Sequence, residues 1–187
     1  EVTIYGRVET PRDASLKAAL EADVIEVHVL EGDNVTAGQT LIQLDDIDIQ
    51  LALQQRQADV KEAQAQIESE NQRFQRDKAL LANQKQLLDL ADKAVQRARK
   101  LEQTRLASQA SLDDALAAYE QQALALKQLQ FDIDNHTLRL AQLQAARQRA
   151  EALLTQAEVN LSRTEIKAPF DGRVAGLTVA LGDRVRP

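Results

Sequence analysis

Few side chains of this sequence have the chemistry that catalysis or metal binding needs. The 187 residues include two histidines, His28 and His136, and neither cysteine nor methionine. Neither histidine has a Ser or Cys nucleophile arranged with it, and no set of His and Cys has the spacing of metal ligands. A Gly-rich phosphate loop is also missing. We therefore expect no enzymatic activity, no metal and no cofactor.

The charges argue against nucleic acid as a partner. The net charge is −6, with both signs interspersed, and nucleic-acid binding needs a basic face. No run of about 18 apolar residues is long enough to span a membrane. The chain begins in a strand-like segment without an initiator Met and stops just after a turn signal. We therefore expect a piece of a longer chain, with any anchor or targeting segment outside it.

Glycine and proline divide the sequence into three segments. Between Gly38 and Pro169 there is neither residue. Inside a helix Gly costs about 1 kcal/mol and Pro about 3 kcal/mol. This long middle segment is therefore expected to be helical throughout, apart from one tip.

A seven-residue period in the middle segment predicts a coiled coil. The first apolar series is Leu53, Val60, Ile67, Phe74, Leu81, Leu88 and Val95, and the second is Leu112, Tyr119, Leu126, Ile133, Leu140, Leu154 and Leu161, broken once at Arg147. Three residues further on lie Arg56, Ala63, Glu70, Asp77, Gln84, Ala91 and Ala98, then Ala115, Gln122, Leu129, His136, Leu143, Ala150 and Ala157. A polar layer near Glu70, Asp77 and His136 could fix the register of the two helices.

The two series do not join in phase, which places a tight turn near 104–109. Ser108 and Ser111 are good N-cap residues, and Asp113 and Asp114 are expected in the first turn that follows. Two helices joined by a short turn pack antiparallel. Each would have about 55 residues and reach about 80 Å.

The two flanks of this hairpin resemble each other when one is shifted by 150 residues. Both contain alternating apolar residues, then Gly-Asp, then Val, which is typical of strand, tight turn and strand. Neither copy has enough apolar surface to fold alone. The identical pairs are Lys17/Lys167, Ala18/Ala168, Val24/Val174, Val29/Val179, Gly32/Gly182, Asp33/Asp183 and Val35/Val185. We expect the two copies to close one small β-sandwich.

These flanks resemble the two halves of the biotinyl-lipoyl-like domain of bacterial periplasmic adaptor proteins, the membrane fusion or HlyD-like family. The quoted segments are VIEVHVLEGDNVTAGQTLIQLDD and LSRTEIKAPFDGRVAGLTVALGDRV. One departure is Ala22, where the family often has Gly. The resemblance implies an α+β fold, a long antiparallel two-helix coiled-coil hairpin inserted into a split lipoyl-like β-sandwich. The implied limits are 1–11 for an edge strand of a truncated β-barrel or membrane-proximal region, 12–45 and 163–187 for the lipoyl-like halves, and 46–162 for the hairpin.

The hairpin tip carries a second resemblance. Many family members that dock onto TolC-type outer-membrane channels have Arg, then Leu four residues on, then Ser seven further, and this chain has Arg97, Leu101 and Ser108. An Arg fork can bond carbonyls or carboxylates at a partner's helix ends, a Leu can fill a groove, and a Ser adds a directional hydrogen bond. The alternative interpretation gives these residues no docking role: Arg97 is a solvated coiled-coil residue, Leu101 belongs to the seam, and Ser108 is an N-cap.

The resemblance implies an adaptor in a tripartite efflux or secretion system. It would link an inner-membrane transporter to a TolC-type channel across the periplasm, as a homo-oligomer, a ring of six in the full-length protein, associated with the inner membrane. Any membrane anchoring would come from segments outside this chain. Two alternatives remain: a structural coiled-coil spacer, and a lipoyl or biotin carrier. The carrier is disfavoured because the turn QLDDIDIQ has no Lys to modify, and Asp45 or Asp46 there resembles a helix N-cap.

Overall fold

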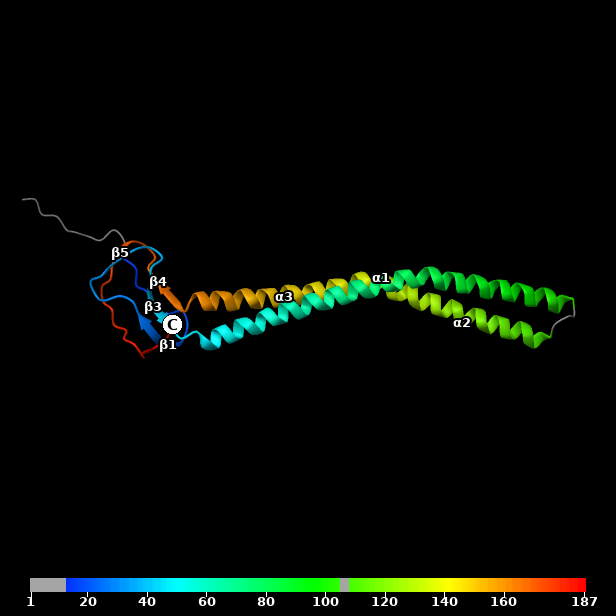
Figure 1. Ribbon diagram of the computed structural model, residues 1–187, viewed down its shortest axis with the longest axis horizontal. Coiled ribbons are helices and arrows are strands. Elements are labelled where there is room, and N and C mark those ends of the chain that lie inside the picture. The colour runs from blue at the N-terminus through cyan, green and yellow to red at the C-terminus, as the bar shows by residue number, and fades with distance from the viewer. Residues whose placement is uncertain (1–12, 105–107) are drawn as a thin grey trace, which may run out of the picture. The chain divides into compact units, whose positions relative to one another are not determined.

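The computed structural model describes residues 13–104 and 108–187. Three helices make up the middle of the chain: α1 (Ile47–Gln103), α2 (Gln109–Asp134) and α3 (His136–Ser162). Short strands precede and follow them, and α1 runs antiparallel to the returning arm formed by α2 and α3 (Figure 1). The predicted α+β fold, with a helical hairpin inserted into a split β-domain, is confirmed. The edge strand predicted for 1–11 lies outside the described residues.

The helices pack along the seam that the seven-residue period predicts. Every predicted seam position of α1 is buried or half-buried, and so is every one of the returning arm except Arg147. Arg147 is exposed, and the neighbouring Ala146 is half-buried in its place. The apolar series therefore lies between the two helices, as in a coiled coil.

Polar side chains bond at the start of α1 and at the start of α2, but only the bonds of Asp45 and Ser108 are to backbone N–H groups. The Ile47 N–H donates to Asp45 Oδ1 at 3.1 Å, and the Gln50 side chain donates to Asp46 Oδ2 at 2.7 Å. At the tip, Ser108 is the N-cap of α2, and Ser111 is not. The expectation for Asp113 and Asp114 is wrong, since the first turn of α2 has no acidic residue. The helix starts at Gln109, so these carboxylates fall in its second turn.

The returning arm differs from the single helix expected from the sequence. It is interrupted at Asn135, and the ribbon changes direction between α3 and α2 (Figure 1). Asn135 still donates its backbone N–H to the Phe131 carbonyl at 3.0 Å, and its side chain donates to the same oxygen at 2.9 Å. The interruption is thus a local bend within a hydrogen-bonded arm.

Two small sheets are built from both flanks of the hairpin. One has four strands in the order β4 (Glu165–Lys167), β3 (Thr40–Leu44), β1 (Ala22–Val27) and β6 (Arg184–Val185). The other pairs β2 (Asn34–Val35) with β5 (Gly172–Arg173). All the pairs are antiparallel. Each sheet therefore needs strands from before and after the helices.

The two copies of the split repeat exchange matching hydrogen bonds. Gly32 donates its N–H to the Val174 carbonyl, and Gly182 donates to the Val24 carbonyl, both at 2.9 Å. The Leu30 N–H donates to Asp33 Oδ2 and the Ala180 N–H to Asp183 Oδ2, both at 2.8 Å. Ala22 pairs with Val185 as Gly172 pairs with Val35, so Ala22 leaves the pairing unchanged.

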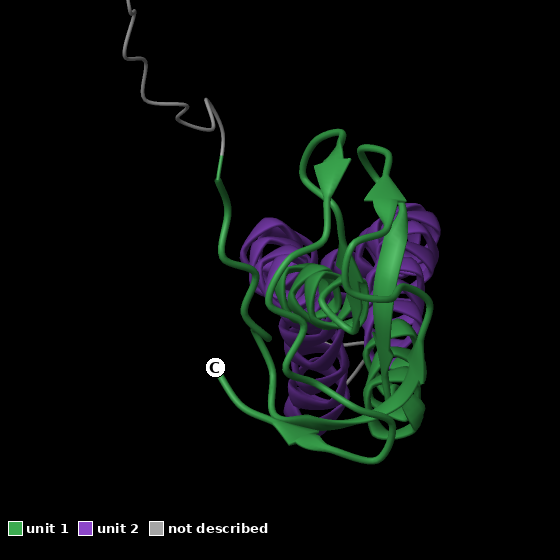
Figure 2. Cartoon of the chain, turned by 90° about the vertical axis from the view of Figure 1, so that its left-hand side faces the viewer, with its two compact units in different colours: residues 1–58, 151–187 green, residues 59–150 purple. Residues whose placement is uncertain are grey.

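The described residues group into two compact units (Figure 2). One contains the residues up to Ala58 together with Glu151–Pro187, and the other is Asp59–Ala150. The core of the first unit draws on both flanks: Val24, Val29, Val35, Leu41, Ile42, Leu44 and Ala168. The units divide the chain within the hairpin helices, so the domain limits expected from the sequence stay predictions. Among the described residues, no helix is both long and apolar enough to cross a membrane.

Candidate docking tip and buried polar layer

The outgoing end of the tip presents Arg97 and Leu101 to solvent. They lie four residues apart on α1, and therefore on one helix face. Arg97 is exposed and Leu101 is 45% exposed. Val95 and Ala98, at predicted seam positions of the same helix, are buried. The seam residues thus hold this turn of α1 in place while its outer side chains stay free for a partner.

Ser108 begins the returning end of the tip and has a structural role there. Its Oγ accepts the Ser111 N–H at 3.4 Å, which is a long N-cap bond. A serine hydroxyl also has one O–H to donate. The cap uses only the acceptor, so an exposed Ser108 can cap α2 and still donate a hydrogen bond to a partner.

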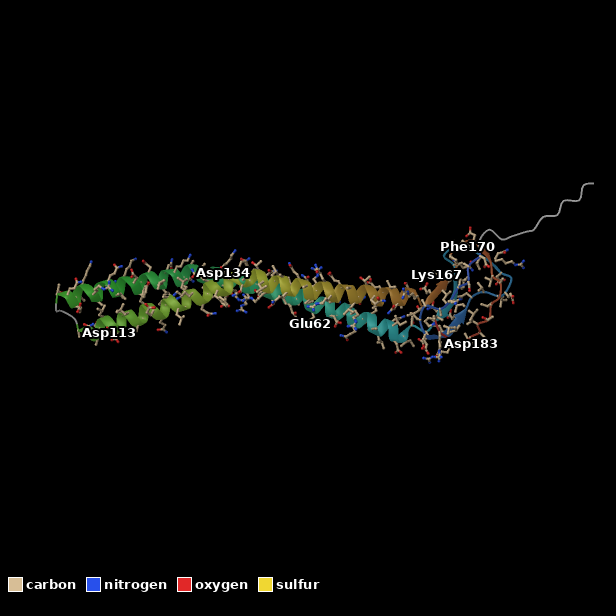
Figure 3. All side chains as sticks on the ribbon, turned by 180° about the vertical axis from the view of Figure 1, so that it is seen from behind. Glu62, Asp113, Asp134, Lys167, Phe170 and Asp183 are labelled. Carbon is tan, nitrogen blue, oxygen red and sulfur yellow. The ribbon has the colours of Figure 1, made fainter. Side chains whose placement is uncertain are left out.

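The charge around the tip changes sign from one arm to the other. Lys93, Arg99 and Lys100 accompany Arg97 near the end of α1, and Lys100 lies in its last turn, where a cation complements the helix dipole. On α2, Asp113 lies close to the tip and Asp134 at the opposite end (Figure 3). The end of α1 is therefore richer in cations, although Asp89, Asp92 and Glu102 lie among them and Asp89 pairs with Lys93, whereas the start of α2 carries Asp113 and Asp114.

A buried carboxylate lies on the seam in the middle of the hairpin. Glu70 of α1 and His136 of α3 have side chains that are 8% and 9% exposed, and Glu70 Oε1 lies 3.0 Å from His136 Nδ1. The same oxygen accepts a hydrogen bond from Arg139 Nε at 2.9 Å. The predicted polar layer is present here for Glu70 and His136. Asp77, the third predicted member, instead pairs with Arg73 at 3.8 Å.

An aromatic stack extends this layer along α1. The Phe74 ring stacks on the His136 ring, with centroids 3.8 Å apart and planes 7° from parallel. Lys78 Nζ lies 4.4 Å from the centroid of the Phe74 ring, within the range of a cation–π contact. His136 is therefore held on two sides, by a carboxylate and by a ring.

Competing effects set the pKa of Glu70. Burial alone would raise it, because a low-dielectric site disfavours the charged form. The hydrogen bonds from His136 and Arg139, together with the positive charge of Arg139, outweigh burial and hold the pKa of Glu70 below its ordinary 4.5. Glu70 is thus an anion at neutral pH with its acceptor oxygen fully engaged.

The sequence did not reveal the arginine of this layer. Arg139 lies off the predicted seam, three residues after His136, and turns a partly buried guanidinium toward Glu70. One signal could have pointed to it: a seam carboxylate needs a buried counter-charge, and positions three residues apart on a helix are neighbours. Phe74 was expected only as an apolar seam residue, and its stacking on His136 was not foreseen.

The two histidines belong to different units, of which the one made of the residues up to Ala58 and Glu151–Pro187 is called the β-unit. His28 lies in the β-unit, where its Nε2 is 3.3 Å from Glu26 at the surface, and His136 is in the other unit. Within residues 13–104 and 108–187 there is no group of three His, Cys, Asp or Glu that could hold a metal ion.

A β-unit assembled from two interlocked copies, with a coiled-coil hairpin between them, defines a split barrel-sandwich architecture. Residues 12–187 match the family model described as RND MFP, barrel-sandwich hybrid domain. The chain therefore belongs to the membrane fusion protein family, and the resemblance seen in the sequence is confirmed.

Individual relatives agree with this family. A UPF0194 membrane protein of Yersinia pseudotuberculosis serotype O:3 (strain YPIII) is 32% identical over 191 residues, covering 97% of this chain and 58% of the relative. The multidrug resistance protein MdtA of Pantoea ananatis (strain AJ13355) is 29% identical, over 96% of this chain and 34% of its own length. The crystal structure of MacA from Actinobacillus actinomycetemcomitans shares the fold, with a TM-score of 0.57 at 24% identity over 95% of this chain and 46% of that one. This chain thus spans little more than half of the Yersinia relative.

Proposed function

We propose that this protein is a non-enzymatic periplasmic adaptor of a tripartite efflux or secretion system. It would join a transporter of the inner membrane, with which the full-length protein is associated, to an outer-membrane channel. One observation carries this proposal: the chain belongs to the membrane fusion family and has a two-helix hairpin between the halves of its β-unit. In such a protein the length of the hairpin sets how far the adaptor extends from the transporter, and the tip residues set which channel it binds.

The tip is the proposed contact with a TolC-type channel, through Arg97, Leu101 and Ser108. These three exposed side chains offer a guanidinium fork, an apolar side chain and a hydroxyl donor, which are three different kinds of contact. The buried Val95 and Ala98 anchor the α1 side of the tip. An arginine fork bonds two acceptors at once, which suits carbonyls or a carboxylate at the ends of a channel's helices.

Export in cells tests the docking proposal. Arg97→Asp and Leu101→Asp should abolish export by the protein with its cognate transporter and channel, while circular dichroism of the purified chain stays unchanged. Matched controls are Arg76→Asp and Leu51→Asp, since Arg76 is exposed on α1 away from the tip and Leu51 is 60% exposed near its start. The docking residues are wrongly assigned if the tip variants export normally, or if the controls fail equally.

The returning arm carries a second apolar stripe, which supports self-association. It occupies the heptad positions turned away from α1, and every member is exposed: Ala110, Ala117, Leu124, Phe131, Leu138, Ala145, Ala152 and Val159. Leu124 is 70% exposed, Phe131 62% and Leu138 60%. A continuous apolar line with a heptad period suits another helix. The corresponding line on α1 is polar after Ala65 except at Ala79, since its other members are Gln72, Gln86, Lys93 and Lys100.

Opposite charges favour packing the outer face of one hairpin against a neighbouring copy. From Gln72 to Gln103, α1 has eight Lys or Arg and four Asp or Glu, whereas α2 has one Lys and five Asp or Glu. Copies arranged head to tail, with α1 of one against α2 of the next, therefore bring opposite charges together. Head-to-tail contacts of one kind close into a ring where the rotation between neighbours allows closure, and form an open filament otherwise; the ring of six that the family resemblance implies is the closed case.

Sedimentation of the full-length protein tests the ring. Leu124→Gln together with Phe131→Gln should shift it toward monomer without changing the helical signal, because both side chains are exposed. Lys127→Gln, between them in sequence and away from the stripe, is the control. An unchanged assembly in the double variant would remove this stripe from the interface without affecting the docking proposal.

A further inference from the structure

The bend of the returning arm lies next to the buried carboxylate of the opposite arm. Asn135 interrupts the arm one residue before His136, and His136 is the residue that meets Glu70. The bent segment Leu129–Leu140 contains neither Gly nor Pro, the residues that most often kink helices. The seam also keeps its period through the bend, with Ile133, His136 and Leu140 all buried or half-buried. The hydrophobic pattern therefore gives no cause for the bend.

Arg139 supplies a local cause. In a regular helix the carbonyl of residue 132 accepts the N–H of residue 136. Here the Asp132 carbonyl accepts a hydrogen bond from Arg139 Nη2 at 2.7 Å. A side chain that enters the ladder of backbone hydrogen bonds is a recognised origin of sharp kinks. The guanidinium thus reaches back from α3 to the last turn of α2 and spans the interruption.

Glu70 holds that guanidinium from the other arm. Its Oε1 binds Arg139 Nε at 2.9 Å, so one planar fork joins the carboxylate of α1 to the Asp132 carbonyl of α2. The Asp132 side chain adds ion-pair contacts of 3.8 Å to Arg139 and 3.6 Å to Arg73. The three helices therefore meet at a single arginine.

We propose that Glu70, His136 and Arg139 form a joint that fixes the bend of the hairpin. His136 is clamped between the carboxylate and the Phe74 ring, which sets the rotation of α3 against α1. Arg139 holds the last turn of α2 away from the path of a straight helix. The direction of the part of the hairpin that carries the tip is then determined by this contact and not by the seam. The joint is independent of whichever partner the tip meets.

Distances between spin labels on the returning arm test the joint. The chain has no cysteine, so Gln121→Cys and Gln142→Cys give one label on each side of Asn135, at exposed positions. A straight helix would separate these residues by about 32 Å. In Arg139→Leu and Arg139→Lys the distance distribution should move toward the straight value or broaden. The lysine variant keeps the charge but cannot bond Glu70 and the Asp132 carbonyl as a fork.

Two controls make the result decisive. Glu68→Gln removes an exposed carboxylate two residues from Glu70 and should leave the distribution unchanged. A label pair on α1 at Gln75 and Gln96, both exposed and both on the tip side of Glu70, should not move in any variant, because the joint lies outside the labelled segment. Glu70→Gln, the mildest change in the joint, should shift or broaden the returning-arm distances. If Arg139→Leu and Glu70→Gln both fold and both give the wild-type distribution, the cluster only stabilises the seam and the joint is excluded.

Discussion

Oε1 of Glu70 lies 3.0 Å from Nδ1 of His136, with both side chains buried at the seam of the hairpin. The same oxygen also accepts from Arg139, so one atom bonds two donors of the opposite arm. Removing either partner of a buried charged contact leaves the other poorly compensated. The stability of the hairpin should therefore be sensitive to this layer.

Acid should weaken this layer in a defined pH range. Because the folded-state pKa of Glu70 lies below 4.5, its charge adds stability that is fully present above 4.5 and lost as the pH falls through the folded value. Thermal unfolding between pH 7 and pH 2 measures the gap in melting temperature between the wild type and Glu70→Gln. This gap should narrow below about pH 4.5. The ionisable partners of Glu70, His136 and Arg139, and the Asp132 and Arg73 side chains that pair beside them, are present in both proteins. A gap independent of pH would contradict the depressed pKa.

The Glu70–His136 contact should be strongly coupled. Glu70→Leu alone is expected to cost about 3 kcal/mol, because it leaves polar groups of α3 without their acceptor. Glu70→Leu combined with His136→Leu should cost much less than the sum of the two single changes, since an apolar layer can replace a buried polar pair. Urea denaturation of the four proteins measures the coupling. Additive free energies would mean that the two side chains contribute independently.

The two roles of Ser108 can be separated by substitution. Ser108→Ala should destabilise α2 by about 1 kcal/mol, because it removes the N-cap. Ser108→Asp keeps a capping oxygen and places a negative charge at a helix N-terminus, so stability should be retained. If the hydroxyl donates to the channel, both variants lose binding to a TolC-type channel in nanodiscs. Binding that is retained in Ser108→Asp would leave Ser108 with the cap alone.

The repeated Gly-Asp turns should respond unequally to alanine. Gly32 and Gly182 have φ of 93° and 86°, so a side chain strains either one by about 1–2 kcal/mol. At Gly32 a Cβ would also lie 3.3 Å from Arg173 Nη2, whereas nothing lies within 4 Å at Gly182. Arg173 bonds the Gly32 carbonyl through Nε at 2.6 Å, so displacing it disturbs a second contact. Chemical denaturation should find Gly32→Ala the less stable variant, and equal losses would show that Arg173 moves freely.

The period-based features of this fold could be read from the sequence. The seam was predictable because a repeat of seven selects one helix face whatever the detailed side chains, and burial follows it from Leu53 to Leu161. The interlocked β-unit was predictable because Gly and Asp recur at the same offset in both flanks. Their turns carry matching hydrogen bonds to Leu30 and Ala180.

The bend could not be read in the same way. Asn135 breaks the arm where the seam period continues undisturbed, and the contact that accompanies the bend joins Arg139 to groups on two other helices. Such a contact depends on how far a long side chain reaches in three dimensions, which spacing along one helix does not encode. The charged residues on the outer surfaces were visible in the sequence, but their partners were not.

The exchange of hydrogen bonds between the repeat copies has a consequence for the order in which this protein assembles. During synthesis the first copy leaves the ribosome with its Val24 carbonyl and Gly32 N–H lacking their partners, and it must wait until Val174 and Gly182 have been made. The hairpin can form first, through contacts that start beside the tip and extend toward its base. The paired helices then bring together Leu44 and Thr164, which share a backbone hydrogen bond of 2.9 Å. Closing this contact therefore does not cost the entropy of closing a loop as long as the whole intervening chain. The hairpin helices would thus act as the template on which the β-unit closes.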